Sequence, residues 1–399
     1  PNLWVAELLY WSSVRAMVRT TLSAIVGFAL GARGLDASPG FERWAAEQGR
    51  AYAGEDEFKR AVANFVQSEL ILKELQSDPE DGAEYGHTMF SDRSPSEFKT
   101  SRFPGHMDPS IGTRGGDVVD GIPDVGTIPV SVDWRAQGAV TPVKDQSSCG
   151  SCWAESAVGN IESMWYLANK GSMKAPAALS VQEVIECDAH DNACYGGFPK
   201  GAYEYVIERG GISSESDYPY GIDGKTICLA NQTFNETCGD GLCDDPPLTN
   251  SCDQTCSDKA AKHQPVAHIA SWQSFASGED TMAAFAATHG PISIGIDASG
   301  GGVGILFPWL QFYHSGVANP KRCTNTIDHG VLIVGYGVEG STKYWIVKNS
   351  WGTKWGESGY FRLIRGASKC GIHLMATSSV ISKTGPALLG APGVEIVVV

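Results

Sequence analysis

The octet Gln-Ser-Ser-Cys-Gly-Ser-Cys-Trp at residues 146–153 constrains the fold of this chain more than any other stretch of its sequence. Its two cysteines have different predicted roles, because Cys149 can form a disulfide while Cys152 can act as a nucleophile. A thiol attacks carbonyl carbons well only as a thiolate, which positive potential stabilises. The small residues before Cys152 and the helix-compatible run after it predict that a helix begins here, with its dipole favouring the thiolate.

Three other residues can supply what a nucleophilic thiol needs: a base, a group that orients the base, and a donor to the oxyanion. His329 is the best candidate base, because it directly precedes a strand-like run and can face a cleft from a strand edge. Asn349 follows another strand-like run, and its amide oxygen can hold one imidazole nitrogen so that the other points at sulfur. Gln146 can donate its side-chain amide to an oxyanion, together with the backbone N–H of Cys152.

These residues lie in motifs that follow one another along the chain: Val132-Asp-Trp-Arg, the octet, Asp328-His-Gly and Asn349-Ser-Trp-Gly. Through these motifs, residues 128–380 resemble the papain family of cysteine peptidases, and its cathepsins in particular. The resemblance implies the roles of nucleophile, base and acid, orienting group and oxyanion donor for the four residues named above. It also implies that Trp351 shields the hydrogen bond between the asparagine and the histidine from water.

The resemblance implies an α+β fold of two subdomains, a helical left domain and a β-barrel-like right domain. The active-site cleft would lie between them, and a helical propeptide would precede them. The pattern of the chain points the same way, because helical segments come first and strand-like runs dominate after residue 290.

The composition changes along the chain and divides it into segments. Residues 17–32 resemble a secretory signal that starts at Met17, because the basic Arg19 precedes an apolar run that ends in small residues. This run is shorter than the roughly 20 residues that span a bilayer. A membrane anchor is the alternative, and residues 1–16 are expected not to be native sequence. Residues 101–127 are rich in Gly, Asp and Pro, which predicts an exposed linker open to proteolysis. The expected segments are upstream residues with a signal peptide (1–34), an inhibitory propeptide (35–100), a linker with the processing region (101–127), the peptidase domain (128–382) and a C-terminal tail (383–399).

The segment before the linker loosely resembles the inhibitory propeptide of the family. Glu57, Phe65 and Leu72 fit the spacing of its helix. Ala61 and Ser68 stand where the family has Arg and Asn. Residues 86–92 match a second propeptide motif, with Thr88 where Asn is usual, and Phe98 also fits. A plain amphipathic helix followed by a turn is the alternative. We expect acid to loosen this segment by protonating carboxylates such as Asp92.

Eleven cysteines suggest an oxidising compartment, and their odd number implies at least one free thiol. The resemblance pairs six of them, Cys149 with Cys194, Cys187 with Cys228, and Cys323 with Cys370. Four more lie in a polar insertion at residues 229–264, namely Cys238, Cys243, Cys252 and Cys256. Two disulfides are expected there rather than a zinc site, with three pairings open. The sequons at Asn231 and Asn235 predict glycosylation of the same insertion.

The resemblance also implies a pocket for the second residue before the scissile bond of a substrate. Its wall would be residues 196–199, with Gly197 offering backbone hydrogen bonds beside Phe198 and Pro199. Its lining and floor would be Gly295, Gly330 and Met375. Because two glycines leave room and methionine is apolar and adaptable, we expect Leu, Phe or a similar side chain to bind there.

The chain departs from the family at Glu155, where a bulky aromatic residue is usual. We expect the Glu155 carboxylate to be exposed and without effect on the thiol. The alternative is that it raises the pKa of the thiol through repulsion between like charges.

The expected function is that of a cysteine endopeptidase zymogen acting through a Cys152 acyl-enzyme. A non-catalytic binding protein of this fold, an exopeptidase and a metal-binding module built on the insertion are the alternatives. We expect no cofactor or metal, and as partners protein and peptide substrates, the chain's own propeptide and cystatin-type inhibitors. The net charge of −15 disfavours nucleic acid. We expect a monomer without membrane attachment in its mature form, carried by the secretory pathway to a lysosome, a vacuole or the extracellular space.

Overall fold

The computed structural model describes residues 39–120, 128–221, 262–276, 278–300 and 307–381. The expected signal peptide, the end of the linker, most of the cysteine-rich insertion and the C-terminal tail lie outside these ranges. So do both sequons, Cys228 and the four cysteines of the insertion. The expectations for those residues therefore stay predictions. Residues 39–120 are called the prosegment below.

The helices form two groups, four in the described part of the prosegment and the others in the domain that follows. Those of the prosegment are α2 (Pro39–Glu47), α3 (Glu55–Leu75), α4 (Pro95–Arg102) and α5 (Pro109–Gly112). Those that follow are α6 (Cys152–Ala168), α7 (Val181–Cys187), α8 (Pro199–Arg209) and α10 (Glu279–Thr288), with the short 3₁₀ helices η1 (Ala193–Tyr195), η2 (Trp309–Phe312) and η3 (Lys369–Gly371).

Ten strands of the described chain form one sheet with both parallel and antiparallel neighbours. They are β1 (Gly82–Tyr85), β2 (Asp117–Val119), β3 (Val132–Asp133), β4 (Ser271–Phe275), β5 (Ile292–Ile296), β6 (Tyr313–Ala318), β7 (His329–Glu339), β8 (Thr342–Lys348), β9 (Tyr360–Ile364) and β10 (Ala376–Val380). Their order is β1-β6-β9-β8-β7-β5-β10-β4-β2, and β3 pairs with β7. Most of the described helices lie before residue 210 and most of the strands after 270, which confirms the expected α+β class.

The prosegment contributes both edge strands of this sheet. Strand β1 pairs antiparallel with β6, and β2 pairs parallel with β4. Exposed sheet edges offer unpaired backbone N–H and C=O groups, so a segment that adds a strand at each edge is held by the backbone itself. Between these two strands the prosegment crosses the domain through α4 and α5, and this crossing places it over the candidate catalytic residues.

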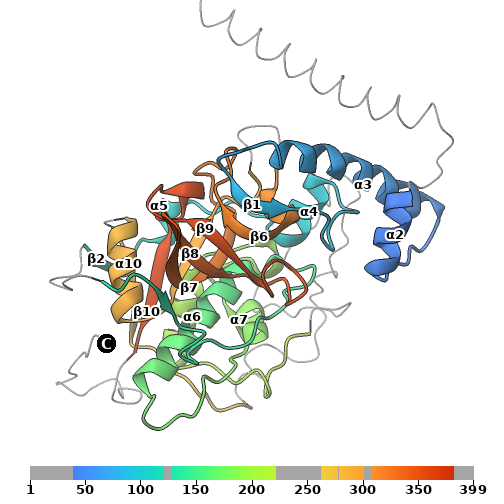
Figure 1. The fold of residues 1–399 in the computed structure, drawn as a ribbon. Coiled ribbons are helices and arrows are strands. Elements are labelled where there is room, and N and C mark those ends of the chain that lie inside the picture. Colours follow the sequence, from blue (N-terminus) through green and yellow to red (C-terminus); the bar gives the residue numbers. More distant parts are fainter. Residues whose placement is uncertain (1–38, 121–127, 222–261, 277, 301–306, 382–399) are drawn as a thin grey trace, which may run out of the picture.

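Helix α6 is the centre of the core. Nearly all of its residues are buried, Trp153 and Ile161 completely. It packs against β7, β5 and β10 on one side and against α7 and α8 on another. In Figure 1, α6 and α7 lie beneath the orange and red strands, while the blue helices α2 and α3 extend to the other side of the molecule.

Local sequence signals account for several helix ends. Ser94 and Glu97 form a reciprocal capping box at the start of α4. Ser180 accepts a hydrogen bond from the backbone N–H of Glu183 at 2.9 Å, so it caps the start of α7. Gly210 ends α8 in the left-handed region at φ 80°, which suits glycine.

Candidate active site

Cys152 occupies the position that its motif predicts, the first residue of α6. Its side chain is buried, and it is the free cysteine of the described chain. Cys149, three residues earlier, is bonded to Cys194 with their Cα atoms 4.6 Å apart, which is the expected pairing. Gly150 lies so close to this partner segment that a Cβ would sit 2.3 Å from the carbonyl oxygen of Cys194. The disulfide and the close approach at Gly150 together fix the turn that precedes α6, and so fix the position of Cys152 at the start of that helix.

The sheet brings His329 and Asn349 together. His329 is the first residue of β7, and Asn349 directly follows its neighbour β8. The imidazole Nε2 lies 2.9 Å from Asn349 Oδ1, which also accepts the backbone N–H of Ser350 at 2.9 Å. Two donors at Oδ1 fix the orientation of the amide. Among the described residues, Nδ1 of the imidazole has no hydrogen-bond partner, so it is the nitrogen left to exchange a proton with Cys152.

Trp351 covers this pair, as expected from the resemblance. Its ring is fully buried and stacks on the imidazole of His329, with ring centroids 5.0 Å apart. Its indole Nε1 donates to the side-chain oxygen of Gln146 at 3.1 Å, and Ser350 Oγ donates to the same oxygen at 2.6 Å. The Gln146 oxygen is therefore occupied, and its amide nitrogen is turned towards Cys149 and the prosegment.

The amide nitrogen of Gln146 already holds a peptide carbonyl of the prosegment. Its Nε2 donates to the carbonyl oxygens of Cys149 at 2.7 Å and of Arg102 at 2.8 Å. The Arg102 carbonyl oxygen thus accepts a hydrogen bond from the group that we expect to donate to an oxyanion. A peptide carbonyl of the prosegment therefore occupies the position expected for a substrate carbonyl.

Four of the six predicted pocket residues come together. Gly295 pairs with Gly330 in the sheet register, and a Cβ at Gly295 would lie 2.5 Å from Met375 Cε. Met375 and Phe198 both approach Gly112 of the prosegment, because a Cβ there would lie 2.5 Å from Met375 Sδ and 3.0 Å from a ring carbon of Phe198. The last turn of α5 therefore fills the space between these two side chains.

Gly197 and Pro199 flank this space in the chain. A Cβ at Gly197 would lie 2.6 Å from Asp191, whose Oδ1 accepts the backbone N–H of Phe198 at 2.9 Å. Burial and, to a smaller extent, the neighbouring Asp188 carboxylate raise the pKa of Asp191 to about 9. Pro199 is the first residue of α8 and belongs to the helix rather than to the pocket contacts described above.

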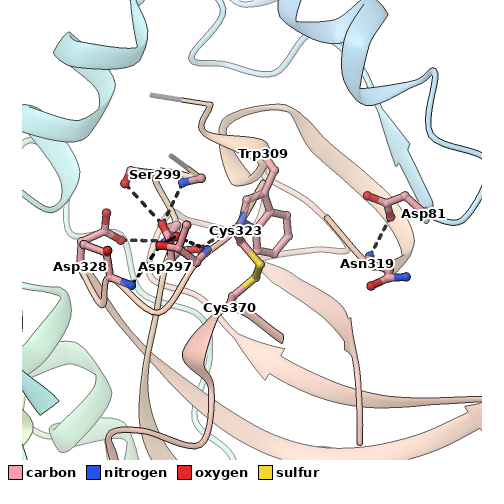
Figure 2. The surroundings of a disulfide bond; sticks show 12 residues. Asp81, Asp297, Ser299, Trp309, Asn319, Cys323, Asp328 and Cys370 are labelled. Atoms are coloured by element: carbon pink, nitrogen blue, oxygen red, sulfur yellow. Dashed lines mark hydrogen bonds between the residues drawn. A yellow bond between two sulfur atoms is a disulfide. The ribbon is translucent and has the colours of Figure 1, made fainter. Parts of the chain in front are cut away.

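A second disulfide steadies the loop that leads to the histidine. Cys323 is bonded to Cys370, again as expected, and the Cys370 carbonyl accepts the backbone N–H of Asp297 at 2.9 Å. Figure 2 shows the carboxyl groups of Asp297 and Asp328 near each other beside this bond. Burial and, to a smaller extent, the Asp297 carboxylate raise the pKa of Asp328 to about 7. Asp328 directly precedes His329, and its carboxylate contributes to the raised pKa of the Cys152 thiol.

Three aromatic rings of the prosegment cover the catalytic pair. The rings of Phe90, Phe98 and Phe103 have their centroids 5.6, 5.3 and 6.4 Å from Trp351. Phe103 also lies 5.3 Å from the imidazole of His329. All three phenylalanines are almost fully buried, so they exclude water from this side of the site.

Arg102 places a buried guanidinium beside the same site. Its Nη1 donates to the carbonyl oxygen of Ser147, its carbon Cζ lies 4.6 Å from the ring centroid of Phe90, and Nη1 is 3.9 Å from Asp145. Burial lowers the pKa of Arg102 to about 9, so the group still carries a positive charge at neutral pH. Its charge disfavours a second positive charge on His329.

Burial keeps both catalytic groups neutral in this state. It raises the pKa of Cys152 to about 12, against the opposing effect of backbone hydrogen bonds. It lowers the pKa of His329 to about 4, although the hydrogen bond to Asn349 opposes the shift. A thiolate and an imidazolium are therefore both disfavoured while the prosegment is in place. The prosegment contributes to this burial, because the ring of Phe103 lies against the imidazole of His329.

Two expectations about carboxyl groups were wrong. Glu155 is not exposed, since its side chain points into the core and only 9% of the residue is accessible. Burial raises its pKa to about 7. Burial also raises the pKa of Asp92, despite its ion pair with Arg50 at 3.1 Å. A raised pKa means that the folded state binds the proton more tightly, so protonation of Asp92 stabilises the folded prosegment rather than loosening it.

Acid acts in the expected direction on a different carboxylate. Asp78 of the prosegment lies 2.6 Å from Lys321 of the domain, and its hydrogen bond to Lys321 lowers its pKa. A lowered pKa stabilises the docked state at higher pH, and that contribution is lost as the pH falls through the lowered value.

Sequence reasoning did not single out Arg102, Phe103 or Ser350. The first two lie in a segment without periodicity, whose composition predicted an exposed linker. Only the recurrence of phenylalanine at positions 90, 98 and 103 could have indicated that this segment is buried against the domain. Ser350 lay inside a recognised motif without an assigned role.

Two further features are judged only over the described ranges. There, no group of three or more His, Cys, Asp or Glu side chains is arranged to hold a metal ion. Over the same ranges, none of the helices combines the length and the apolarity that crossing a membrane requires.

Comparison with known proteins agrees with this geometry. The family described as "Papain family cysteine protease" matches residues 128–380. Cathepsin F of Mus musculus is 34% identical over 349 residues, which cover 86% of this chain and 65% of that protein. Cysteine proteinase 15A of Pisum sativum is 33% identical over 371 residues, which cover 86% of each chain. The alignment with cathepsin F of Drosophila melanogaster spans only half of that protein.

The similarity to solved structures extends beyond the family domain. Procathepsin L2 from the larval midgut of Tenebrio molitor matches with a TM-score of 0.69 at 29% identity, over 86% of this chain and 99% of that one. The recombinant stem bromelain precursor matches with a TM-score of 0.65 at 30% identity, over 86% and 97%. Both are described as precursors, and both spans are longer than residues 128–380. The chain belongs to the papain family of cysteine proteases.

Proposed function

We propose that this chain is the proenzyme of a cysteine endopeptidase, with residues 128–382 as the peptidase and residues 35–127 as its inhibitor and processing linker. One observation carries the proposal: the Arg102 carbonyl accepts a hydrogen bond from Gln146 Nε2 at 2.8 Å. A peptide carbonyl of the chain itself thus lies at the donor that would bind a substrate's oxyanion. The match to procathepsin and bromelain precursors supports the same organisation.

The proposed reaction begins when the prosegment leaves and water returns to the cleft. His329 Nδ1 then takes the proton of Cys152, and the thiolate attacks the substrate carbonyl carbon. Gln146 Nε2 and the Cys152 backbone N–H bind the oxyanion. His329 returns the proton to the leaving amine, which leaves a thioester on Cys152. A water molecule, deprotonated by His329, hydrolyses the thioester and restores the thiol.

The proposed specificity follows from the space that Gly112 fills between Phe198 and Met375. This space has apolar walls, and the two glycines opposite leave room for a side chain. We propose that Leu or Phe binds there as the second residue before the scissile bond. An arginine in the same place would meet the apolar side chain of Met375 at the floor. Faster cleavage of Arg peptides than of Leu or Phe peptides would overturn this assignment.

One experiment separates the endopeptidase from the alternatives. The purified proform and its Cys152→Ala variant are incubated in acid and their new N-termini are sequenced. Cleavage near Ile128 in the first and not in the second supports a self-processing peptidase. If neither is cleaved and the proform, after its prosegment is removed by another protease, hydrolyses no peptide, the non-catalytic binding protein is favoured. Removal of only terminal residues from a long peptide would favour the exopeptidase.

The remaining proposals concern the localisation, the inhibitors and the covalent modification of the protein. Passage through the secretory pathway is supported by the disulfides and by the cathepsin relatives. Cystatin-type inhibitors are proposed as partners because such proteins would enter the same cleft. The pairing of Cys187 with Cys228 and the glycosylation of Asn231 and Asn235 stay predictions.

A further inference from the structure

Behind the catalytic asparagine lies a small cavity with two polar atoms that lack partners. The cavity has a volume of about 20 Å³ and is lined by residues of α6, β7 and β8, Glu155 and Asn349 among them. Asn349 Nδ2 and Glu155 Oε1 are both buried, and neither has a hydrogen-bond partner among the described residues. One is a donor and the other an acceptor. A cavity needs roughly 10–15 Å³ and two or more polar partners to hold one water molecule.

The orientation of Asn349 is already determined on its other side. Its Oδ1 accepts the histidine Nε2–H and the Ser350 N–H, both at 2.9 Å. Its Nδ2 must therefore point away from His329, and burying this donor without an acceptor is costly. Glu155 offers the unused acceptor that lines the same cavity. The remaining charged groups that line it, such as Glu162, already have partners of their own.

We propose that Glu155 is a positioning residue, which holds Asn349 through one water molecule bound between Glu155 Oε1 and Asn349 Nδ2. The proposal rests on the proposed peptidase function and names a residue for it. The hydrogen bonds then run from the imidazole Nε2–H to Asn349, from Asn349 Nδ2–H to the water, and from the water to the Glu155 carboxyl group. Such a chain of hydrogen bonds polarises its members, so a negative charge at its end stabilises the imidazolium of His329.

The charge of Glu155 depends on the groups around it. Lys144 and Lys348 favour its ionised form, while burial and the carboxylates of Glu162 and Glu215 oppose it. Tyr220 also faces it, because the Glu155 charge raises the pKa of that phenol. Burial is the largest effect and raises the pKa of Glu155 to about 7. The carboxyl group is therefore ionised on the alkaline side, where the imidazolium of the mature enzyme loses its proton.

Two variants separate the acceptor from the charge. Glu155→Leu removes both, and Glu155→Gln keeps an acceptor oxygen without a charge. The control is Glu208→Gln, which neutralises an exposed carboxyl group of α8 that neither lines the cavity nor belongs to the groups named above that act on Glu155. Each mature enzyme is titrated with an irreversible thiol-directed inhibitor, so that kcat is given per reactive site and a partly misfolded sample does not distort it. The pH dependence of kcat/KM is then measured on one Leu-containing peptide.

We expect Glu155→Leu to lower kcat about tenfold, equivalent to about 1.4 kcal/mol, with a smaller change in KM. Glu155→Gln should recover kcat to within about threefold, the range of a retained hydrogen bond. Its alkaline limb should move to lower pH by several tenths of a unit. Glu208→Gln should match the wild type. Equal kcat and equal pH profiles for all four enzymes overturn the proposal while leaving the peptidase function intact. A wild-type protein that neither hydrolyses peptides nor reacts with the inhibitor overturns the function itself.

Discussion

Removing the ring of Phe98 tests whether aromatic packing holds the prosegment over the thiol. Phe98 is fully buried, and its ring contacts Trp351 of the domain and Phe90 and Phe103 of the prosegment. Truncation of a buried Phe to Ala costs about 3–5 kcal/mol. If most of this cost falls on the docked state, the population with an open site rises by roughly 10²–10³, at about 1.4 kcal/mol per tenfold.

The assay is the rate at which iodoacetamide alkylates Cys152 in the unprocessed protein at pH 7, read by peptide mass spectrometry. When opening and closing are fast compared with alkylation, this rate follows the population of the open state. We expect the Phe98→Ala rate to exceed the wild-type rate by roughly 10²-fold or more. Phe98→Leu, which keeps most of the apolar contact, should fall between them. A Phe98→Ala rate within about threefold of the wild-type rate would refute the reasoning, because the ring would then contribute nothing to closure.

Three more predictions concern charge and space. The raised pKa of Glu155 predicts that the free energy of unfolding falls by on the order of 3 kcal/mol as the pH rises from 4.5 to 7. In the Cys152→Ala proform, Glu155→Gln should make this fall smaller, as measured by urea titration at each pH. Parallel curves with and without Glu155→Gln would contradict the prediction. Asp78→Asn removes the ion pair with Lys321, so acid should no longer weaken prosegment docking through this pair. The rate of self-processing should then depend less on pH below 4. An unchanged pH profile would show that other groups cause the acid-induced release of the prosegment. Gly150→Ala should prevent the octet turn from closing on Cys194, and folding yields with correct disulfides should fall sharply; a normal yield would show that the turn can shift.

The sequence was enough to place the candidate catalytic groups on their elements, because each lies in a motif whose local structure follows from its own residues. Cys152 begins a helix, and His329 and Asn349 lie where neighbouring strands begin and end. The burial of Glu155 could not be predicted, because its surroundings come from elements far apart in the chain. The path of Phe103 over the imidazole was missed for the same reason. The sign of the Asp92 effect needed its degree of burial, which no local pattern contains.

If the prosegment keeps Cys152 and His329 neutral, the pH dependence of thiol alkylation must change when the prosegment is removed. The rate constant for iodoacetamide at Cys152 is measured from pH 4 to pH 11 in the unprocessed protein and again after the prosegment is removed. With the pKa of the thiol near 12, the unprocessed rate should still be rising at the upper end. The processed enzyme should reach its plateau several pH units lower. Identical profiles before and after processing would contradict the account.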